Sequence, residues 1–355
     1  MTRKILIFRI GHFGDTLVAL PALWAIRRHY RDAQLTLLTN HDRRNKNYVS
    51  PAQVLPLTGL IDNVIAYPND RGLGSLAAFA ALILQIRLEN FDEVIYLMPR
   101  VRSESQIYRD RKFFRSAGIS ELKGSEFLLR ERLDPPDPSD STEIERESDF
   151  LVRMVTEIGI PVSKPETELS ITTDEARASS QWLAAEGLDH GDLRLVAVAP
   201  GSKLRSKMWP ENRFVEVLGR LIQKFDCHAI IFGGLEDREL ANRMIRAIGK
   251  GSNAAGSLGI RADAALLQKC HLYLGNDTGT MHLASAVGTA CVAMFTRMEW
   301  NGRWSPFGEN NRLFRSAVPC PGCAAGDTAN VHPCMEAIGA DEVYDACSEI
   351  LSNKS

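Results

Sequence analysis

The chain has 355 residues, more than one ordinary hydrophobic core holds, so its length favours two domains. Its 42 basic and 44 acidic side chains leave a formal net charge of −2, which argues against a nucleic-acid-binding protein. The longest apolar run, Leu76 to Leu84, falls well short of the roughly 20 residues of a membrane span, and the N-terminal segment lacks a signal-peptide core. We therefore expect a cytosolic protein that at most touches a membrane surface.

Short apolar strands alternate with helical segments along most of the chain. In the first half, strands are predicted at Lys4–Ile10, Leu35–Thr39, Val64–Tyr67 and Val94–Met98, and helices from Asp15, at Leu76–Leu88 and at Glu145–Ile158. In the second half, strands are predicted at Leu195–Ala199, His228–Phe232, Leu272–Leu274 and Ala290–Phe295, with helices at Phe214–Phe225, Asp237–Ile248 and Met281–Val287. This alternation predicts an α/β fold of two Rossmann-like, doubly wound parallel-sheet lobes, residues 1–170 and 171–330, which face an interdomain cleft.

The segment Gly11–Asp15 follows the first strand and opens a helix. Its glycines would let a ligand approach the backbone, but it lacks the third glycine of the dinucleotide fingerprint. A carboxylate at Asp15 would repel a pyrophosphate, so we expect the loop, including His12 and Gly14, to meet a neutral hydroxyl. The alternative is that Asp15 simply caps the helix.

The segment Ala199–Pro210 again follows a strand directly. It combines Gly201, Ser202 and three cations, Lys203, Arg205 and Lys207. Such a turn is suited to cradle a phosphorylated ligand, although a solvated basic loop with Trp209 as a packing residue is the other interpretation.

The segment Gly275–Ala284 is the most specific of the three. A strand is followed by a polar turn with Asp277, Thr278 and Gly279, and a helix begins near Thr280 and contains His282. Backbone N–H groups at a helix N-terminus stabilise anions, so this turn would stabilise a diphosphate leaving group without a metal. The alternative is that Thr278 is a cap and His282 a surface side chain.

In this order and spacing, the segments resemble glycosyltransferase family 9, the ADP-heptose:lipopolysaccharide heptosyltransferases. The resemblance rests on G-x-x-G-D and Leu20-Pro21-Ala22-Leu23, on Lys207 two residues before Trp209-Pro210, and on a close match of Gly275–Ala284 to G-N-D-[ST]-G-x-x-H-L-A. Ile231–Asp237 is similar to a turn whose acidic residue holds the nucleotide ribose. Weaker similarity runs over nearly the whole chain.

The resemblance implies the GT-B fold and an inverting, metal-independent transfer of heptose from ADP-heptose to an inner-core acceptor. Asp15 would be the general base and Lys207 would bind the diphosphate. The donor would be held by Gly201, Ser202, Asp237, Glu236, Asp277, Thr278, Gly279, Thr280 and His282. A C-terminal helix within residues 331–355 would pack back on the first lobe.

Six basic residues crowd the stretch from Arg100 to Arg115. An anionic glycolipid acceptor would suit them, and Arg100 and Arg102, nearest the strand end, are the expected contacts. A solvated basic face is the alternative.

The C-terminal cysteines form a half-site for a metal, Cys320-Pro321-Gly322-Cys323, followed by Cys334. Some members of the family bind iron at a cysteine cluster here. We expect a structural zinc or iron site with Cys347 as the fourth ligand, while His332 in that place and free thiols both remain open. Catalysis itself would need no cofactor.

Three other functions stay open. The chain could be a family 9 transferase for another nucleotide sugar or another acceptor, such as a capsule, an O-antigen or a protein. It could be a non-catalytic sugar-nucleotide binding protein, or a dehydrogenase, although no intact G-x-G-x-x-G is present.

Overall fold

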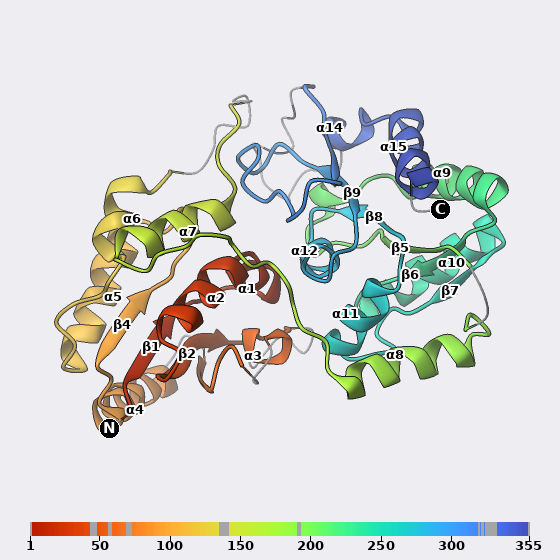
Figure 1. Cartoon of the computed structure of the whole chain (residues 1–355). Coiled ribbons are helices and arrows are strands. Elements are labelled where there is room, and N and C mark those ends of the chain that lie inside the picture. Colours follow the sequence, from red (N-terminus) through yellow and green to blue (C-terminus); the bar gives the residue numbers. More distant parts are fainter. Residues whose placement is uncertain are drawn as a thin grey trace. The chain divides into compact units, whose positions relative to one another are not determined.

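The computed structural model describes residues 2–42, 48–55, 59–68, 73–134, 142–189, 193–318, 320, 323 and 332–353. The chain divides into two compact units, Met1–Pro135 with Glu145–Thr167, and Pro136–Ile144 with Glu168–Ser355. Each unit is a parallel sheet with helices, so the predicted two-lobe α/β fold is confirmed (Figure 1).

The first unit is built on a parallel sheet with the strand order β3-β2-β1-β4. The strands are β1 (Lys4–Phe8), β2 (Gln34–His41), β3 (Asn63–Pro68) and β4 (Glu93–Tyr96). The helices are α1 (Phe13–Val18), α2 (Leu20–His29), α3 (Pro51–Val54), α4 (Leu73–Glu89), α5 (Glu104–Ser116), α6 (Ser125–Glu131) and α7 (Glu147–Glu157). β1 is central because its side chains Ile5, Leu6 and Ile7 are fully buried.

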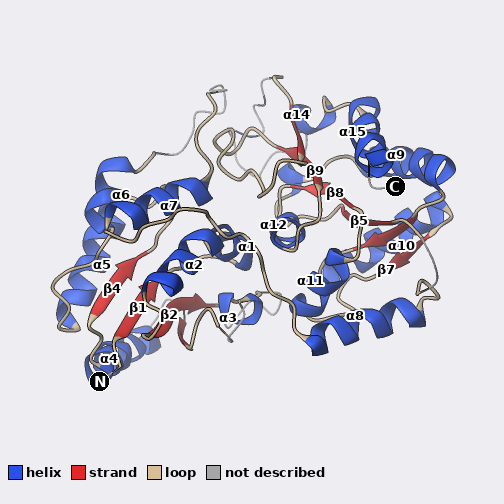
Figure 2. Cartoon of the chain, viewed as in Figure 1, coloured by secondary structure: helices blue, strands red, loops and turns tan. Residues whose placement is uncertain are grey.

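The second unit has the strand order β10-β9-β8-β5-β6-β7, again parallel. Its strands are β5 (Leu195–Ala199), β6 (His228–Ile231), β7 (Gly251–Asn253), β8 (Leu272–Asn276), β9 (Cys291–Phe295) and β10 (Arg312–Arg315). Its helices are α8 (Thr173–Ala185), η1 (Arg205–Lys207), α9 (Glu211–Phe225), η2 (Leu235–Asp237), α10 (Arg238–Ile248), α11 (Ile260–Gln268), α12 (Gly279–Ala286), α14 (Pro333–Glu336) and α15 (Ala340–Asn353). Figure 2 shows how helices and strands alternate through this unit.

All eight predicted strands are present, within a few residues of the expected limits. β7 and β10 were not predicted, because β7 is short and polar and β10 places its two arginines at its ends, so neither has a continuous apolar run. Each sheet reverses its strand order beside its first strand, between β1 and β4 and between β5 and β8. Ligands of open α/β sheets bind at the carboxyl ends of the strands at this point.

The C-terminal helix α15 packs on α9 of the second unit. Its apolar side chains Val343, Cys347 and Leu351 are fully buried in the same core as Val217 and Leu221 of α9. Apolar positions four residues apart on both helices explain this pairing.

Asp263 on α11 has a carboxyl group whose burial destabilises its charged form. Its Oδ1 is completely buried and has no hydrogen-bond partner among the described residues. Burial raises the pKa of this carboxyl to about 8. Because the folded state then binds a proton that the unfolded chain releases near pH 4, this group's contribution to stability falls as the pH rises from about 4 to about 8.

We therefore expect Asp263→Asn to stabilise the protein, and to do so more at pH 8 than at pH 5. The extra gain at pH 8 should be about 3 to 4 kcal/mol, measured as the free energy of unfolding in urea at both pH values. Asp345→Asn, at an exposed position of α15, is the control and should change stability equally at both. An equal effect of Asp263→Asn at both pH values would mean that Asp263 is charged in the folded state.

Candidate functional site

Lys207 and Asp277 meet at the carboxyl edge of the second sheet. Lys207 ends η1 in the loop after β5, and Asp277 directly follows β8, the neighbouring strand. Lys207 Nζ lies 2.7 Å from Asp277 Oδ2, and their side chains are only 16% and 6% exposed. Two of the predicted segments, 70 residues apart in sequence, thus form one charged pair at the point where the strand order reverses.

Asn276 holds these two loops together. Its Oδ1 accepts a hydrogen bond from Trp209 N at 3.0 Å, and its Nδ2 donates to Pro200 O at 2.8 Å. Asn276 is fully buried, and the Trp209 ring packs edge-on against Phe214 at 4.9 Å between centroids. The position of Lys207 is therefore set by a buried amide and an anchored indole.

Asp237 is brought to the same edge from the turn after β6. Its Oδ2 accepts from Gly234 N at 2.9 Å, and a Cβ on Gly201 would lie only 2.2 Å from its Oδ1. Glycine at position 201 therefore leaves room for the carboxylate. Burial raises the pKa of Asp237, while the Gly234 N–H opposes that shift. Glu236 beside it is exposed, and Ser202 uses its hydroxyl within its own loop, accepting from Leu204 N.

Helix α12 begins at this edge. Thr278 is its N-cap, Gly279 and Thr280 are partly exposed, and His282 is 5% exposed. The His282 ring lies 6.1 Å from that of Trp304, which the Arg303 guanidinium covers at 4.3 Å. Arg303 and Trp304 were not predicted as site residues. The sequence feature that could have indicated them is a cluster of aromatic and basic residues beyond the last expected strand. The first-turn N–H groups of α12 would attract an anion.

In the first unit, Asp15 lies in the first turn of α1. Its Oδ2 accepts from His12 N at 2.7 Å. Gly11 has φ +137°, and a Cβ there would come within 2.7 Å of the Asp15 side chain. His12 is the N-cap residue, and Asp15, at the third position of the helix, bonds back to it as in a capping box and remains partly exposed. Capping and base catalysis are compatible because each carboxylate oxygen has two lone pairs.

Two residues that the sequence did not single out surround Asp15. Arg9 is fully buried at the end of β1 and donates to Asp15 O and, at 3.1 Å, to Leu97 O beyond β4. Tyr48 donates to Gly11 O at 2.8 Å. Burial raises the pKa of Tyr48 to about 12, and the Asp15 carboxylate adds to this shift. The loop is thus fixed across the reversal point of the first sheet.

Arg100 and Arg102 differ from the expectation that they contact an acceptor. Arg102 is buried, bonds to the Asp110 carboxylate and donates to Tyr96 Oη at 3.1 Å. Arg100 is also buried, donates to Glu145 Oε1 at 3.0 Å and covers the Phe150 ring at 4.3 Å. Both guanidinium groups are therefore compensated by carboxylates inside the first unit, and their contact with an acceptor stays a prediction.

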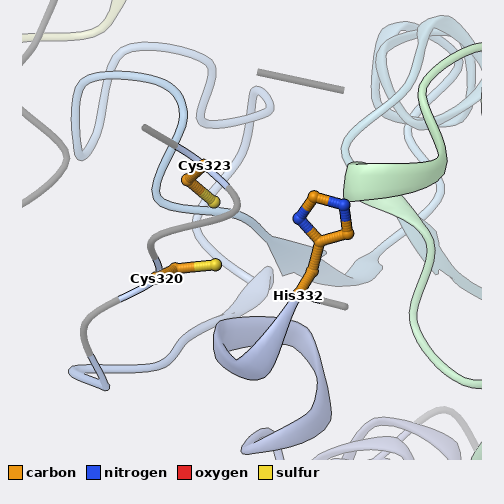
Figure 3. Close-up of side chains that lie close together, drawn as sticks. All are labelled: Cys320, Cys323 and His332. Atoms are coloured by element: carbon orange, nitrogen blue, oxygen red, sulfur yellow. The ribbon is translucent and has the colours of Figure 1, made fainter. Parts of the chain in front are cut away.

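The C-terminal cysteines form a compact cluster with a histidine. Ligand atoms of Cys320, Cys323 and His332 all lie within 4.8 Å of one another, and the three residues are buried. Figure 3 shows their side chains converging. Cys334 Sγ is 3.5 Å from Cys323 Sγ. This contact with Cys323 lowers the pKa of the Cys334 thiol, and the backbone N–H of Arg297 adds to the effect.

Cys347 does not belong to this cluster in the described structure. It is fully buried on α15 within the apolar core. Burial raises the pKa of its thiol, and the nearby ionisable group is Cys227. The residues whose ligand atoms converge with Cys320 and Cys323 include His332 but not Cys347, so His332 and not Cys347 is the fourth candidate ligand.

Comparison with known proteins adds four likenesses. The profile of glycosyltransferase family 9 (heptosyltransferase) matches residues 79–330. Lipooligosaccharide heptosyltransferase 2 of Campylobacter jejuni is 22% identical, over 99% of both chains. A family 9 glycosyltransferase structure from Veillonella parvula superposes with a TM-score of 0.77 at 17% identity, covering 99% of this chain and 97% of the other. E. coli heptosyltransferase WaaC with ADP-2-deoxy-2-fluoro heptose gives a TM-score of 0.63 at 13% identity, covering 99% and 100%.

Proposed function

The chain belongs to glycosyltransferase family 9, and on that premise we propose that it transfers a heptose from ADP-heptose to a lipopolysaccharide inner-core acceptor. The observation that carries the donor side is the Lys207–Asp277 pair at the reversal point of the second sheet, with Asp237 beside it. The GT-B fold with two parallel-sheet lobes is shown by the strand orders and the structural relatives. The donor identity and the acceptor are our inference.

On the donor side, Lys207 binds the diphosphate and neutralises the negative charge that grows on it as the glycosidic bond breaks. Asp277 keeps the ammonium group in place, and Thr278, Gly279, Thr280 and His282 add the dipole and side chains of the α12 terminus. Asp237, with Glu236, accepts hydrogen bonds from the ribose hydroxyls. We propose that these groups replace a catalytic metal, and the chain contains no Asp-x-Asp pair.

On the acceptor side, Asp15 removes the proton of the attacking hydroxyl, and His12 and Gly14 lie in the loop that the acceptor meets. One base on the acceptor and a stabilised leaving group on the donor are the requirements of a single displacement, which inverts the anomeric centre. The relatives are named as lipopolysaccharide and lipooligosaccharide heptosyltransferases, and a lipid-linked acceptor is held in a membrane, so we propose that the enzyme works at the inner face of the cytoplasmic membrane.

A thermal-shift panel of ADP, UDP, GDP and CDP tests the donor. We expect ADP alone to raise the Tm, because only a ligand that binds the folded state stabilises it, and we expect Lys207→Ala to weaken the shift. Arg246→Ala, at an exposed position of α10, is the control and should leave the shift unchanged. A shift with UDP or GDP alone would indicate a family 9 transferase with another donor, and no shift with any nucleotide would contradict a donor site here.

We further propose that Cys320, Cys323, His332 and Cys334 hold a structural metal, zinc or iron. The residue types suit such an ion, since three thiols and an imidazole are the ligands of a Cys₃His site. Cys320, Cys323 and His332 have ligand atoms within 4.8 Å of one another, Cys334 Sγ lies 3.5 Å from Cys323 Sγ, and all four residues are buried. The Arg297 backbone N–H, just after β9, is a hydrogen-bond partner of the Cys334 thiol on α14, so such a metal would link α14 to this part of the chain. It would contribute to stability and take no part in the transfer.

About one metal ion per purified chain is the expected result of elemental analysis. His332→Ala should lower that content several-fold and lower the Tm. Cys347→Ala should leave the metal in place, because Cys347 does not converge with Cys320, Cys323 and His332. A metal content that depends on Cys347 and not on His332 would reverse our assignment, and no metal in either protein would indicate free thiols.

A further inference from the structure

Helix α4 of the first unit carries apolar side chains on its inner and its outer side. Its described inner positions include Leu82 and Ile86, which are 6% and 1% exposed. Its outer side is not polar, in contrast to that of an ordinary surface helix. Leu84 is 57% exposed and Leu88 is 76% exposed, the highest value among the large hydrophobic side chains described.

These exposed side chains form one continuous face. Ala77, Ala81, Leu84 and Leu88 follow one another at helical spacing, and all four are exposed. Arg87 borders this face and is exposed as well. A face of this kind is costly in water, and such faces mark sites of contact with a membrane or another protein.

The neighbouring helix supplies positive charge. α5 contacts α4, and the rings of Phe113 and Phe79 meet edge-on at 6.0 Å between centroids. Arg109, Lys112 and Arg115 are exposed on α5, and Arg109 lies one helical turn before Phe113, on the side of the contact. Tyr108, 47% exposed, adds an amphipathic ring. An apolar face next to a cationic one is the pattern that binds an anionic lipid surface.

We propose that the outer faces of α4 and α5 form a membrane-binding surface for anionic phospholipid. α4 would lie in the plane of the bilayer interface, because its exposed apolar side chains follow one face along the helix. None of the helices described here is long and apolar enough to cross a membrane. Leu84 and Leu88 would enter the acyl boundary, while Arg87, Arg109, Lys112 and Arg115 would contact phosphate groups. The inference rests on the proposed function only for which membrane the protein would bind. The surface itself is inferred from the exposed apolar side chains of α4 and the exposed basic side chains of α5.

Sedimentation with lipid vesicles tests it without an activity measurement. We expect the full-length protein to bind vesicles that contain phosphatidylglycerol and to bind pure phosphatidylcholine vesicles much more weakly. Leu84→Ser with Leu88→Ser should reduce binding about tenfold or more. Arg109→Gln, Lys112→Gln and Arg115→Gln together should reduce it similarly and remove most of its salt dependence.

Two matched controls separate this surface from general effects. Leu313→Ser replaces a 41%-exposed leucine on β10. Arg246→Gln, Lys250→Gln and Lys269→Gln remove three charges from the second unit. Both variants should bind like the parent. Transfer to a soluble, delipidated acceptor should be unchanged in the α4 and α5 variants, so a failure of the membrane surface is distinguishable from a failure of the proposed reaction.

Three results would overturn the proposal. The first is equal binding of the parent and the Leu84/Leu88 variant to anionic vesicles. The second is absence of vesicle binding by a folded parent. The third is a dimer of the parent in light scattering that is absent in the Leu84/Leu88 variant. A second copy of the chain, and not a membrane, would then cover α4.

Discussion

Asp15→Asn is expected to lower kcat by about a thousandfold and to leave the protein fully folded. The asparagine oxygen can still accept the hydrogen bond from His12 N, so the helix cap survives, but the amide cannot take a proton from the acceptor. A general base contributes roughly 10² to 10⁴ to a rate. The measurement is ADP release from ADP-heptose in the presence of acceptor, together with the Tm of each variant.

Asp15→Ala separates the two roles of the side chain. It should lose activity to the same extent as Asp15→Asn. It should also lose about 1 kcal/mol of stability, because alanine has no side-chain oxygen to accept the capping hydrogen bond from His12 N. Activity in Asp15→Asn within tenfold of the parent would exclude Asp15 as the base and leave the capping interpretation alone.

Lys207→Ala is expected to lower kcat/KM by about a hundredfold to a thousandfold, the usual loss when one stabilising group is removed from a leaving group's site. It should also destabilise the protein by about 2 kcal/mol, because Asp277 is 6% exposed and would be left as a buried charge without its cation. Steady-state kinetics and urea unfolding measure the two effects on the same sample.

The double variant Lys207→Ala with Asp277→Asn distinguishes catalysis from stability. Removal of both charges should restore most of the lost stability, since no unpaired carboxylate remains, while the rate stays low because the ammonium group is still missing. If the double variant regained the parent rate, Lys207 would act only through the fold, and its catalytic role would be lost.

Local patterns predicted much of the architecture correctly. Buried parallel strands are short apolar runs, so β1, β5 and β8 could be identified from their own residues. β10 could not, since Arg312 and Arg315 mask a pattern that depends on its pairing with β9. The order of the motifs along the chain also indicated which strands would carry them at their carboxyl ends.

Charge patterns were less informative than apolar ones. The arginines after β4 were expected to face an acceptor. In the structure, Arg100 pairs with Glu145, which is 45 residues away in sequence, and Arg102 pairs with Asp110. A guanidinium looks the same in the sequence whether it is solvated or paired, because its partner is chosen by packing. The exposed members of the cluster, Arg109, Lys112 and Arg115, became identifiable only once burial was known.

The sequence by itself determined the two parallel-sheet lobes, the family, and the placing of Asp15, Lys207 and Asp277 in loops after strands, because strands, turns and helix starts are encoded by neighbouring residues. Only the tertiary structure decided that Lys207 pairs with Asp277, that His332 and not Cys347 joins the cysteines, and that α15 packs on α9. The physical reason is the same in all three cases. Contacts between residues far apart in sequence depend on which faces are buried together, and composition and spacing do not specify that choice.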